Sequence, residues 1–402
     1  HKRRLLKMLA LWGLLTLLFS TVVLGMVQLL GSWLVPGFYD SIDWLVPVLG
    51  GLAALWILGN FVVTVFAAGS LAYVLVGFYQ QYGAAEAHTD LTAIAQLQPA
   101  SGWRLSAPLL TLILVAAMTS AILLGHWLVD GIQIKDTVTV VAHRGAAGKA
   151  PENTMAAIRQ AITDNADWVE IDVQETADGA VVVMHDSDFM KLASVDLKVR
   201  DGTLQQIRDI DVGSWFDPRF SAERVPTLLE VLEKTRGKAR VVIELKYYGH
   251  DRQLEQRVVE IVEQTGMTDE VAIMSLKYEG VQKIRALRPD WTVGLLSATA
   301  IGDLARLDVD FLAVATGMAS PGFVRRSHEQ GKQVFVWTVN DAVSMSRMMS
   351  LGVDGIITDE PALAREVIAD RADLNPAERL LMHAAILFGR PEPRGRYRDE
   401  SP

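Results

Sequence analysis

Residues 1–130 carry almost no charge, and this restricts the possible folds of the 402-residue chain more than any other feature. Only ten Asp, Glu, Lys or Arg residues occur there, and four of them lie among the first seven positions. Residues 131–402 carry nearly all the remaining charge. Long uncharged runs are typical of membrane helices, whereas mixed charges are typical of a soluble surface. We therefore expect a membrane region followed by a globular region.

Three uncharged runs are long enough to cross a membrane, which takes about 20 apolar residues in a helix. They are Met8–Val35, Trp44–Tyr82 and Ala107–Val129. We expect the second run to form one long or kinked helix, because division at Gly59 would leave a first piece of about 15 residues, too short to span. The alternative is a set of buried core helices, and a signal peptide could imitate the first run only.

The basic residues among the first seven positions favour a cytoplasmic N-terminus. Three crossings would then place everything after Asp130 outside the cytoplasm, whereas an even number would reverse this. We expect an integral protein of the bacterial cell membrane with an extracytoplasmic globular region. Because the chain begins with His1 rather than Met, we expect a fragment or a processed form whose membrane region is incomplete.

Composition excludes several classes of protein and site. A net charge of −9 argues against a nucleic-acid-binding protein, which needs a basic face. The chain contains no cysteine, so disulfides and thiolate metal sites are excluded. The absence of cysteine does not identify the cellular compartment, because proteins in oxidising spaces need not contain it.

From residue 137 onward, short apolar runs alternate with helix-like patterns. The predicted strands are Thr137–Ala142, Trp168–Val173, Arg240–Leu245, Val271–Ser275, Thr292–Leu296, Phe311–Val314, Gln333–Thr338 and Gly355–Thr358. The predicted helices include residues 154–165, 228–235, 252–265, 280–287 and 342–351. Eight strands with about 30 residues per repeat predict an α/β fold of the (β/α)8 TIM-barrel type. A doubly wound open sheet is the alternative; polar residues at the ends of several strands favour the barrel.

One segment interrupts the alternation. Val181–Met184 is predicted as an additional strand, and residues 187–225 follow as an irregular insertion, too long for an ordinary loop. The insertion could be a substrate lid, a specificity element or a plain surface excursion. We place the barrel at residues 137–370. The remaining residues, 371–402, are expected to form a C-terminal helix and a tail.

Carboxylates at the ends of two predicted strands indicate a metal site. Glu170 and Asp172 are two positions apart on a strand, so they point to the same face. Inside a barrel, unpaired carboxylates are very costly, and a hard divalent cation such as Mg²⁺ or Ca²⁺ would neutralise them. Glu244 would complete a three-carboxylate site, and Lys246 could neutralise a substrate phosphate. The alternative is a structural salt-bridge network in which Glu244 and Lys246 pair.

Two histidines follow short apolar runs in the same part of the chain. His143 and His185 suit a general acid and a general base on opposite sides of a phosphorus centre. Arg144 offers a forked donor for phosphate oxygens, and Asp186 could orient one imidazole. The sequence thus predicts metal-assisted chemistry on a phosphate ester.

Three further features have simpler interpretations. Asn153 or Thr154 is expected to cap a helix, and this is the favoured interpretation of the segment Pro151–Thr154. Asp359 is likewise expected to cap the last helix of the barrel. Trp337 could form an apolar wall for the alcohol part of a substrate.

Together these residues resemble the glycerophosphodiester phosphodiesterase family. The matching motifs are HRG at 143–145, PENT at 151–154, ExD at 170–172, HD at 185–186, ExK at 244–246, VWTVN at 336–340 and TDEP at 358–361. They occur in the family's order and cover roughly residues 138–368. The apolar N-terminal helices resemble the membrane domain of some bacterial members.

The resemblance implies a TIM barrel that hydrolyses glycerophosphodiesters to glycerol 3-phosphate and an alcohol. It assigns one divalent metal ion, Mg²⁺ or Ca²⁺, to Glu170, Asp172 and Glu244. His143 and His185 would form the acid/base pair, and the phosphate would be held by Arg144 and Lys246. The family mechanism often has the glycerol 2-hydroxyl attack phosphorus to give a cyclic phosphate, which water then opens.

Alternative functions remain within and outside this chemistry. The substrate could be a deacylated phospholipid or a lipid still in the bilayer, as in lysophospholipase D chemistry, and a phospholipase-like or sphingomyelinase D-like phosphodiesterase is a near relative. A different class is a catalytically silent barrel tethered to the membrane. The expected partners are the substrate and the lipid bilayer, and the membrane region could also support an oligomer.

Overall fold

A computed structural model describes residues 2–38, 42–82, 138–249, 252–299 and 302–374, together with single positions between 108 and 123 and residue 378. The chain separates into two compact units. One comprises His1–Gly131 with Asn375–Leu381, and the other Ile132–Leu374 with Met382–Pro402. The border near residue 131 coincides with the change from uncharged to charged sequence.

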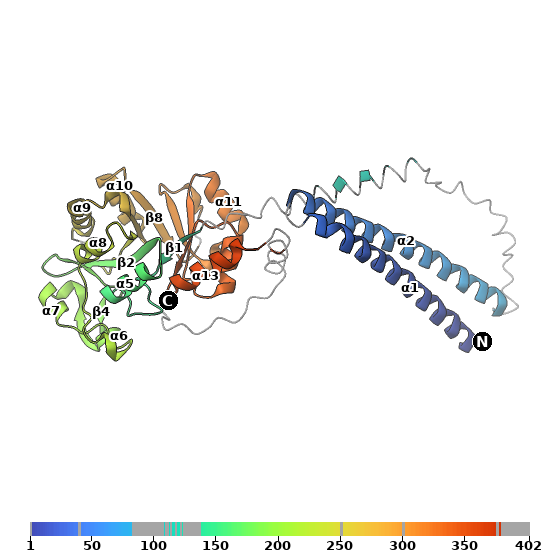
Figure 1. Ribbon diagram of the computed structural model, residues 1–402, viewed down its shortest axis with the longest axis horizontal. Helices are drawn as coiled ribbons and strands as arrows, with labels where there is room; N and C mark the ends of the chain where they lie inside the picture. Colours follow the sequence, from blue (N-terminus) through green and yellow to red (C-terminus); the bar gives the residue numbers. More distant parts are fainter. Residues whose placement is uncertain are drawn as a thin grey trace. The chain divides into compact units, whose positions relative to one another are not determined.

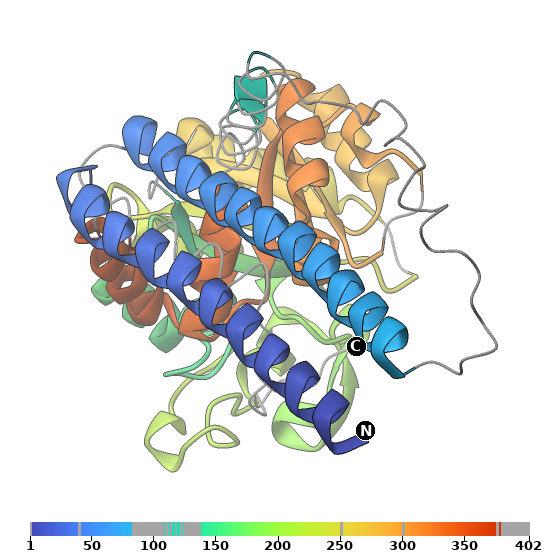
Figure 2. The same cartoon turned by 90° about the vertical axis from the view of Figure 1, so that its right-hand side faces the viewer.

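The first unit contains two long helices that lie side by side in both views (Figure 1, Figure 2). Helix α1 spans Lys2–Leu34, the 3-10 turn η1 spans Val35–Phe38, and α2 spans Ile42–Tyr82. The second uncharged run is therefore one helix, as predicted, with Pro47 inside it.

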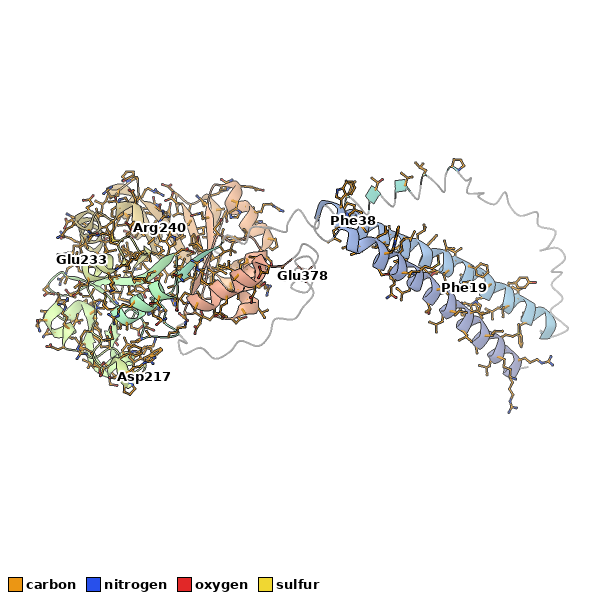
Figure 3. All side chains as sticks on the ribbon, in the orientation of Figure 1. Phe19, Phe38, Asp217, Glu233, Arg240 and Glu378 are labelled. Carbon is orange, nitrogen blue, oxygen red and sulfur yellow. The ribbon has the colours of Figure 1, made fainter. Side chains whose placement is uncertain are left out.

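Both helices are long and apolar enough to cross a membrane. Their candidate spans, Arg3–Leu34 and Pro47–Tyr79, have mean hydropathies of 2.1 and 2.2, and only 0% and 6% of the most apolar stretch is buried. A core helix of a soluble protein would be mostly buried instead. Apolar side chains such as Phe19, which is 53% exposed, project from the pair (Figure 3).

The two helices touch through small and hydrogen-bonding residues. A Cβ atom on Gly59 would lie 2.5 Å from Val23, so the close approach requires glycine there. Near the other end, the Trp12 indole nitrogen donates to the Ala67 carbonyl at 3.2 Å and to the Ser70 hydroxyl at 3.0 Å. Because an early residue of α1 meets a late residue of α2, the helices are antiparallel.

The third predicted span, Ala107–Val129, lies outside the described residues apart from a few single positions. Of the predicted C-terminal helix and tail at residues 371–402, the structure describes only residues 371–374, which include the end of α13, and Glu378. The last complete helix that is described is α13, Pro361–Ala372.

The second unit is a closed barrel of eight parallel strands. In spatial order these are β1 (Thr139–Ala142), β11 (Gly355–Thr358), β10 (Gln333–Trp337), β9 (Phe311–Ala315), β8 (Thr292–Ser297), β7 (Val271–Ser275), β6 (Arg240–Leu245) and β2 (Trp168–Glu175). Pairing between β1 and β2 closes the ring. The predicted TIM barrel is confirmed, and the open sheet is excluded. Each predicted strand agrees with an observed one to within two residues at either end.

Helices cover the outside of the barrel (Figure 1). They are α5 (Met155–Thr163), α8 (Leu228–Thr235), α9 (Leu254–Thr265), α10 (Tyr278–Leu287), α11 (Pro321–Glu329), α12 (Ala342–Ser350) and α13, with the 3-10 turns η4 (Thr268–Glu270) and η6 (Thr316–Met318). Between β8 and β9 the described residues hold only the 3-10 turn η5, Leu304–Arg306, where a helix would be usual. The outward-facing strand residues and the inner faces of the helices form one large apolar core.

The barrel interior is apolar over most of its depth and acidic at the carboxyl ends of the strands. Its apolar part contains Val141, Val242, Ala272, Met274, Leu296, Phe311, Ala313, Phe335 and Ile357. On β2 and β6, the same inward-facing rows continue into Glu170, Asp172 and Glu244, because side chains alternate along a strand. The apolar layer thus supports a layer of carboxylates at the barrel mouth.

The segment after β2 has more regular structure than the sequence predicts. Strand β3, Val181–Val183, pairs antiparallel with β2, close to the predicted extra strand. The insertion then contains β4 (Asp188–Phe189), α6 (Met190–Ala193), β5 (Val195–Lys198), η2 (Val199–Asp201), α7 (Leu204–Arg208) and η3 (Pro218–Phe220). Its own apolar cluster includes Phe189, Ile207 and Val212, so the insertion is not irregular as the sequence predicted.

Candidate active site

Three buried carboxylates meet at the barrel mouth. Glu170 and Asp172 come from β2 and Glu244 from the neighbouring β6, where Asp172 and Glu244 are paired in register. One oxygen from each lies within 4.8 Å of the others, and their residue exposures are 1%, 1% and 4%. The structure therefore brings together the three residues that the sequence proposes as metal ligands.

The carboxylates strongly perturb one another's protonation. Burial and the nearby Asp172 charge raise the pKa of Glu170 to about 7. Burial and Asp172 likewise raise the pKa of Glu244 to about 8. Burial also opposes the charge on Asp172, but Lys246, His185 and Arg144 outweigh it and hold the pKa of Asp172 well below its usual range. Three charged carboxylates in this space would need more positive charge than the side chains supply.

The donor set fits a hard divalent cation. Such ions take oxygen ligands, and all three candidates are carboxylates. Glu170 Oε1 is buried and has no hydrogen-bond partner among the described residues, which is costly for an isolated buried acceptor. A buried carboxylate oxygen without a hydrogen bond, beside two further carboxylates, is well suited to bind a metal ion.

Two cations contact these carboxylates. Lys246, directly after β6, places its Nζ 3.1 Å from Asp172 and 2.9 Å from Glu244. Burial opposes its charge, but these two carboxylates raise the pKa of Lys246 above its ordinary value, so it remains a cation. The Arg144 guanidinium lies 3.1 Å from Glu152 and 3.4 Å from Asp172. Both predicted phosphate ligands therefore lie at the carboxylate site.

Arg144 is positioned by an unusual turn after β1. It has a φ of +49°, and its backbone N–H donates to Glu170 at 2.8 Å. Gly145 follows with a φ of +82°, and a Cβ there would lie 2.6 Å from Ala157. The glycine of the HRG motif is therefore required by both conformation and space.

His143 is held by residues that lie far along the sequence but follow neighbouring strands of the barrel. Its Nδ1 lies 2.7 Å from Asp359 Oδ1, and Asn340 donates to the other oxygen of Asp359 at 2.6 Å. Burial lowers the pKa of His143, but Asp359 and Glu170 outweigh it and leave the pKa raised. The prediction that Asp359 caps the last helix was wrong: the N-cap position of α13 is Glu360, and the Asp359 side chain faces His143.

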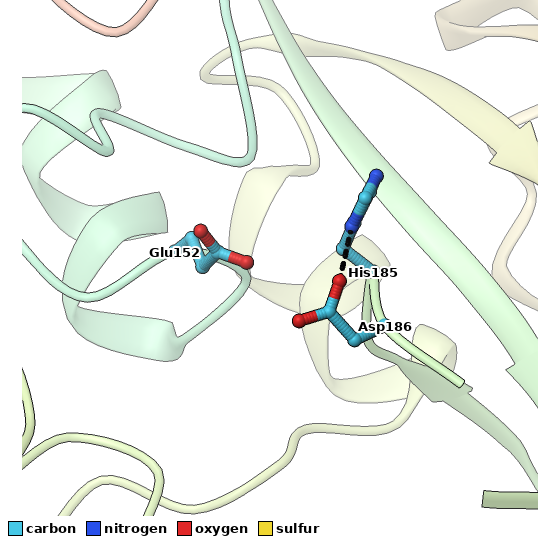
Figure 4. Close-up of side chains that lie close together, drawn as sticks. All are labelled: Glu152, His185 and Asp186. Atoms are coloured by element: carbon cyan, nitrogen blue, oxygen red, sulfur yellow. Dashed lines mark hydrogen bonds and ion pairs between the residues drawn. The ribbon is translucent and has the colours of Figure 1, made fainter. Parts of the chain in front are cut away.

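His185 has an aspartate partner of its own. Its Nδ1 lies 2.8 Å from Asp186 Oδ1, as shown in Figure 4, so Asp186 does contact an imidazole as the sequence suggested. Gln174 donates to the carbonyls of Met184 and Asp186 at 2.8 and 2.7 Å, and the Tyr248 hydroxyl donates to the His185 carbonyl at 2.6 Å. These bonds fix the backbone that carries the histidine.

The PENT segment has two roles. Thr154 is the N-cap of α5 and accepts a hydrogen bond from the Ala157 N–H, which confirms the capping prediction. Asn153, with a φ of +56°, instead donates to Asp172 at 2.8 Å. Its left-handed backbone turns the side chain toward the carboxylates. Sequence reasoning assigned Asn153 no role beyond capping.

Glu152 lies near His185 and Asp186, and one ligand atom from each falls within 4.8 Å of the others (Figure 4). A cation already occupies this neighbourhood: Lys191 of α6 lies 3.7 Å from Glu152 and 4.0 Å from Asp186. The insertion thus reaches the site through Lys191. Sequence reasoning named Glu152 only as part of the PENT motif, with no role of its own, and missed Lys191, whose only signal was charge.

Trp337 ends β10 beside the apolar interior of the barrel. Its indole nitrogen donates to the Ala313 carbonyl at 3.1 Å, which fixes the ring. The side chain is partly buried, so one part of it remains accessible. This placement suits an apolar wall, and that role stays a prediction.

The sequence of the barrel is similar to those of known proteins. Residues 143–363 match the glycerophosphoryl diester phosphodiesterase family. A glycerophosphodiester phosphodiesterase of Caldanaerobacter subterraneus subsp. tengcongensis is 34% identical over 232 residues, which cover 55% of this chain and 94% of that protein. One of Bacillus subtilis is 30% identical over 254 residues, 58% of this chain and 87% of that protein.

Solved structures agree with the fold and the family. An Oleispira antarctica phosphodiesterase, solved with the product sn-glycerol-3-phosphate, is 28% identical with a TM-score of 0.55 and covers 57% of this chain and 96% of its own. A glycerophosphodiester phosphodiesterase of Agrobacterium tumefaciens is 30% identical with a TM-score of 0.52, covering 57% and 99%.

Proposed function

Because the chain belongs to the glycerophosphoryl diester phosphodiesterase family, we propose that it hydrolyses glycerophosphodiesters to sn-glycerol 3-phosphate and an alcohol. The observation that carries the proposal is the meeting of three buried carboxylates and two aspartate-paired histidines at the carboxyl ends of the barrel strands. Active sites of TIM barrels form at this end. The product bound to the Oleispira antarctica relative supports the same product here.

In this proposal Glu170, Asp172 and Glu244 hold one divalent metal ion, Mg²⁺ or Ca²⁺. When bound, the ion stabilises the negative charge that develops on the phosphate oxygens. Lys246 and Arg144 bind the phosphate. Lys246 is protonated at neutral pH, because its two carboxylate partners stabilise the ammonium form. Trp337 contacts the alcohol part of the substrate.

The two histidines move the protons. Each is held at Nδ1 by an aspartate, so Nε2 is the nitrogen that exchanges a proton with the substrate. One histidine removes the proton of the attacking hydroxyl, and the other donates a proton to the departing alcohol oxygen. If the glycerol 2-hydroxyl attacks first, the same pair exchanges roles when water opens the cyclic phosphate.

Release of glycerol 3-phosphate from glycerophosphocholine tests the proposal. The purified full chain, in detergent with added Mg²⁺ or Ca²⁺, is expected to release it, and EDTA is expected to stop the reaction. A catalytically silent barrel would release none with either metal from any headgroup variant, and that result would refute the proposed activity.

The two exposed apolar helices favour a second candidate substrate, a lysophospholipid in the bilayer. Lysophospholipase D chemistry breaks the same type of phosphodiester bond. Parallel assays with lysophosphatidylcholine and glycerophosphocholine separate the two: a higher kcat/KM for the lipid would favour the lysophospholipase, and a higher value for the deacylated compound would favour the first proposal.

For the whole chain, we propose an integral membrane protein. Residues 1–130 form the membrane region, which could also mediate an oligomer, and residues 137–370 form the catalytic barrel, with a C-terminal helix and tail at 371–402. The basic N-terminus and an odd number of crossings would place the barrel outside the cytoplasm. The two helices α1 and α2 support the membrane part of this proposal.

A further inference from the structure

A pocket of about 190 Å³ adjoins the proposed phosphate-binding residue Lys246. Its walls come from β2, from the end of β6 and from the insertion. The residues that line it include Gln174, Ser187, Lys198, Arg200, Lys246 and Tyr248. Since a water molecule occupies about 30 Å³ of liquid, the pocket has room for a small alcohol.

The insertion gives this pocket excess positive charge. Lys198 ends β5 and has no ion pair with any residue that the structure describes. Arg200, in η2, donates to the Tyr248 carbonyl at 3.1 Å and lies 3.8 Å from Asp201. That ion pair is exposed and therefore weak.

The acidic residue on the pocket wall does not cancel these charges. Glu175 is 6% exposed, and its Oε1 lies 2.8 Å from the Arg257 guanidinium. Its second oxygen accepts the Gln253 N–H at 3.2 Å. Lys198 and Arg200 thus remain as positive charges that an incoming anion can meet.

The pocket shares its wall with the catalytic residues. Gln174 and Tyr248, which line it, both donate to the backbone around His185. Lys246 lines the pocket and also contacts Asp172 and Glu244. A substrate phosphate at Lys246 would therefore have one of its two ester groups directed toward the insertion.

We propose that this pocket binds an anionic group, a carboxylate or a phosphate, carried by the alcohol part of the substrate, and that Lys198 and Arg200 select for it. The inference rests on the proposed function and specifies its substrate class. In glycerophosphoserine, the carboxylate is joined to the ester oxygen through two carbon atoms, a separation that a pocket of this size can accommodate. The insertion is then a specificity element of the barrel.

Two pairs of substrates test the proposal with the full chain and added metal. Glycerophosphoserine differs from glycerophosphoethanolamine by one carboxylate, and glycerophosphoglycerol phosphate differs from glycerophosphoglycerol by one phosphate. We expect a higher kcat/KM for the member with the added anionic group in at least one pair, by about threefold or more, the effect of one exposed ion pair. The pair that shows it identifies the anionic group.

Charge variants assign the preference to the pocket. Lys198→Gln should reduce the preference and Lys198→Glu should abolish or reverse it, with little change for the member of each pair that lacks the added anionic group. Lys238→Gln is the matched control, because Lys238 is exposed two residues before β6, at the amino end of that strand and so at the other end of the barrel. It should leave the preference unchanged.

Equal kcat/KM values within both pairs, or a preference that survives Lys198→Glu, would overturn the proposal. Hydrolysis of no substrate would instead be a failure of the proposed function. In that case, binding of the four compounds to the His143→Ala variant still decides the matter. Tighter binding of the member with the added anionic group in at least one pair, removed by Lys198→Glu, supports the pocket, and equal binding within both pairs refutes it.

Discussion

The Asp359 carboxylate controls the protonation of His143. It lies 2.7 Å from Nδ1, and Asn340 fixes it from the other side at 2.6 Å. A neighbouring negative charge stabilises the imidazolium, so Asp359 raises the pKa of His143 against the opposing effect of burial. The same bond orients the ring and selects which nitrogen faces the substrate.

Asp359→Asn should therefore lower the pKa of His143. The limb of the pH profile of kcat/KM that reports His143 is expected to move to lower pH, because the protonated form loses its stabilising charge. Activity should fall as well, since the orienting acceptor is weakened. A pH series of kcat/KM for wild type and variant measures both effects.

Asp354→Asn is a matched control for this prediction. Asp354 lies 2.7 Å from His328 Nε2, in a His–Asp pair directly before β11, whereas Asp359 follows that strand. The control should leave the pH profile in place. A profile for Asp359→Asn that coincides with that of Asp354→Asn would remove Asp359 from the catalytic site.

If the three carboxylates bind a metal ion only in the folded protein, metal binding should stabilise the fold. A cation at about 100 times its Kd contributes about 2.7 kcal/mol, which for a domain of this size raises Tm by about 5–10 °C. Glu244→Gln should remove most of that shift, because a ligand is lost. Thermal unfolding of the chelated protein with and without Mg²⁺ or Ca²⁺ measures it.

Glu255 provides the control, because it is also a buried glutamate with a lysine partner. It accepts from the Tyr247 hydroxyl at 2.8 Å and lies 3.2 Å from Lys283, in the first turn of α9, and it is not one of the three clustered carboxylates. Glu255→Gln should keep the metal-induced shift. An equal shift in wild type and Glu244→Gln would show that Glu244 is not a metal ligand.

At the scale of single residues, the sequence predicts the functional side chains near the ends of strands. It does not predict which residues from other parts of the chain contact them. His143 and Glu170 were found because strand ends meet at the barrel mouth. Asp359 is 216 positions from His143, and only the pairing of β1 with β11 makes them neighbours. Asn153 was missed because its role depends on a left-handed backbone that the sequence does not reveal.

At the scale of single elements, two strands owe their fit to glycine. A Cβ on Gly294 of β8 would lie 2.2 Å from the Phe311 ring, and one on Gly355 of β11 would lie 2.2 Å from the Phe335 ring. These rings pack edge to face at 5.4 Å inside the barrel. The glycines provide the space that the two rings occupy under the carboxylates.

Gly294→Ala should destabilise the barrel by about 1–3 kcal/mol through overpacking. Gly322→Ala is the comparison, because its Cβ would meet only the flexible Arg326 side chain at 3.5 Å, within α11. That change should be neutral or stabilising, as alanine favours helix. Thermal unfolding of both variants measures the difference, and equal Tm values would contradict the packing argument.

The sequence predicts barrel strands better than it predicts the insertion. Strands such as Phe311–Ala315 are continuous apolar runs buried on both faces along most of their length, so their pattern is strong. The insertion is built from elements of two to five residues, too short to show a period. Its apolar cluster depends on contacts between these pieces, which no single stretch of sequence indicates.

At the scale of the whole molecule, the membrane orientation is the main open prediction. The absence of cysteine makes single-cysteine labelling direct, because each introduced thiol is the only one in the chain. Gly37→Cys reports the turn between α1 and α2, and Ala222→Cys reports an exposed position of the barrel unit. With a cytoplasmic N-terminus and three crossings, both should lie outside.

A membrane-impermeant maleimide applied to intact cells should therefore label both variants. Labelling of Cys at position 37 alone would place the barrel in the cytoplasm and indicate an even number of crossings. Labelling of neither would place the N-terminus outside or show that the helices do not cross the membrane. The same reagent on lysed cells controls for reactivity.

The most direct test of the catalytic site is the turnover of His143→Ala beside wild type. Both full-length proteins are loaded with the same divalent metal, and glycerol 3-phosphate release from glycerophosphodiesters is measured. We predict a loss of kcat of about 100- to 10,000-fold, the contribution of a general acid or base, with an unchanged metal-induced shift in Tm. Near-normal turnover by His143→Ala would contradict the proposed acid/base pair.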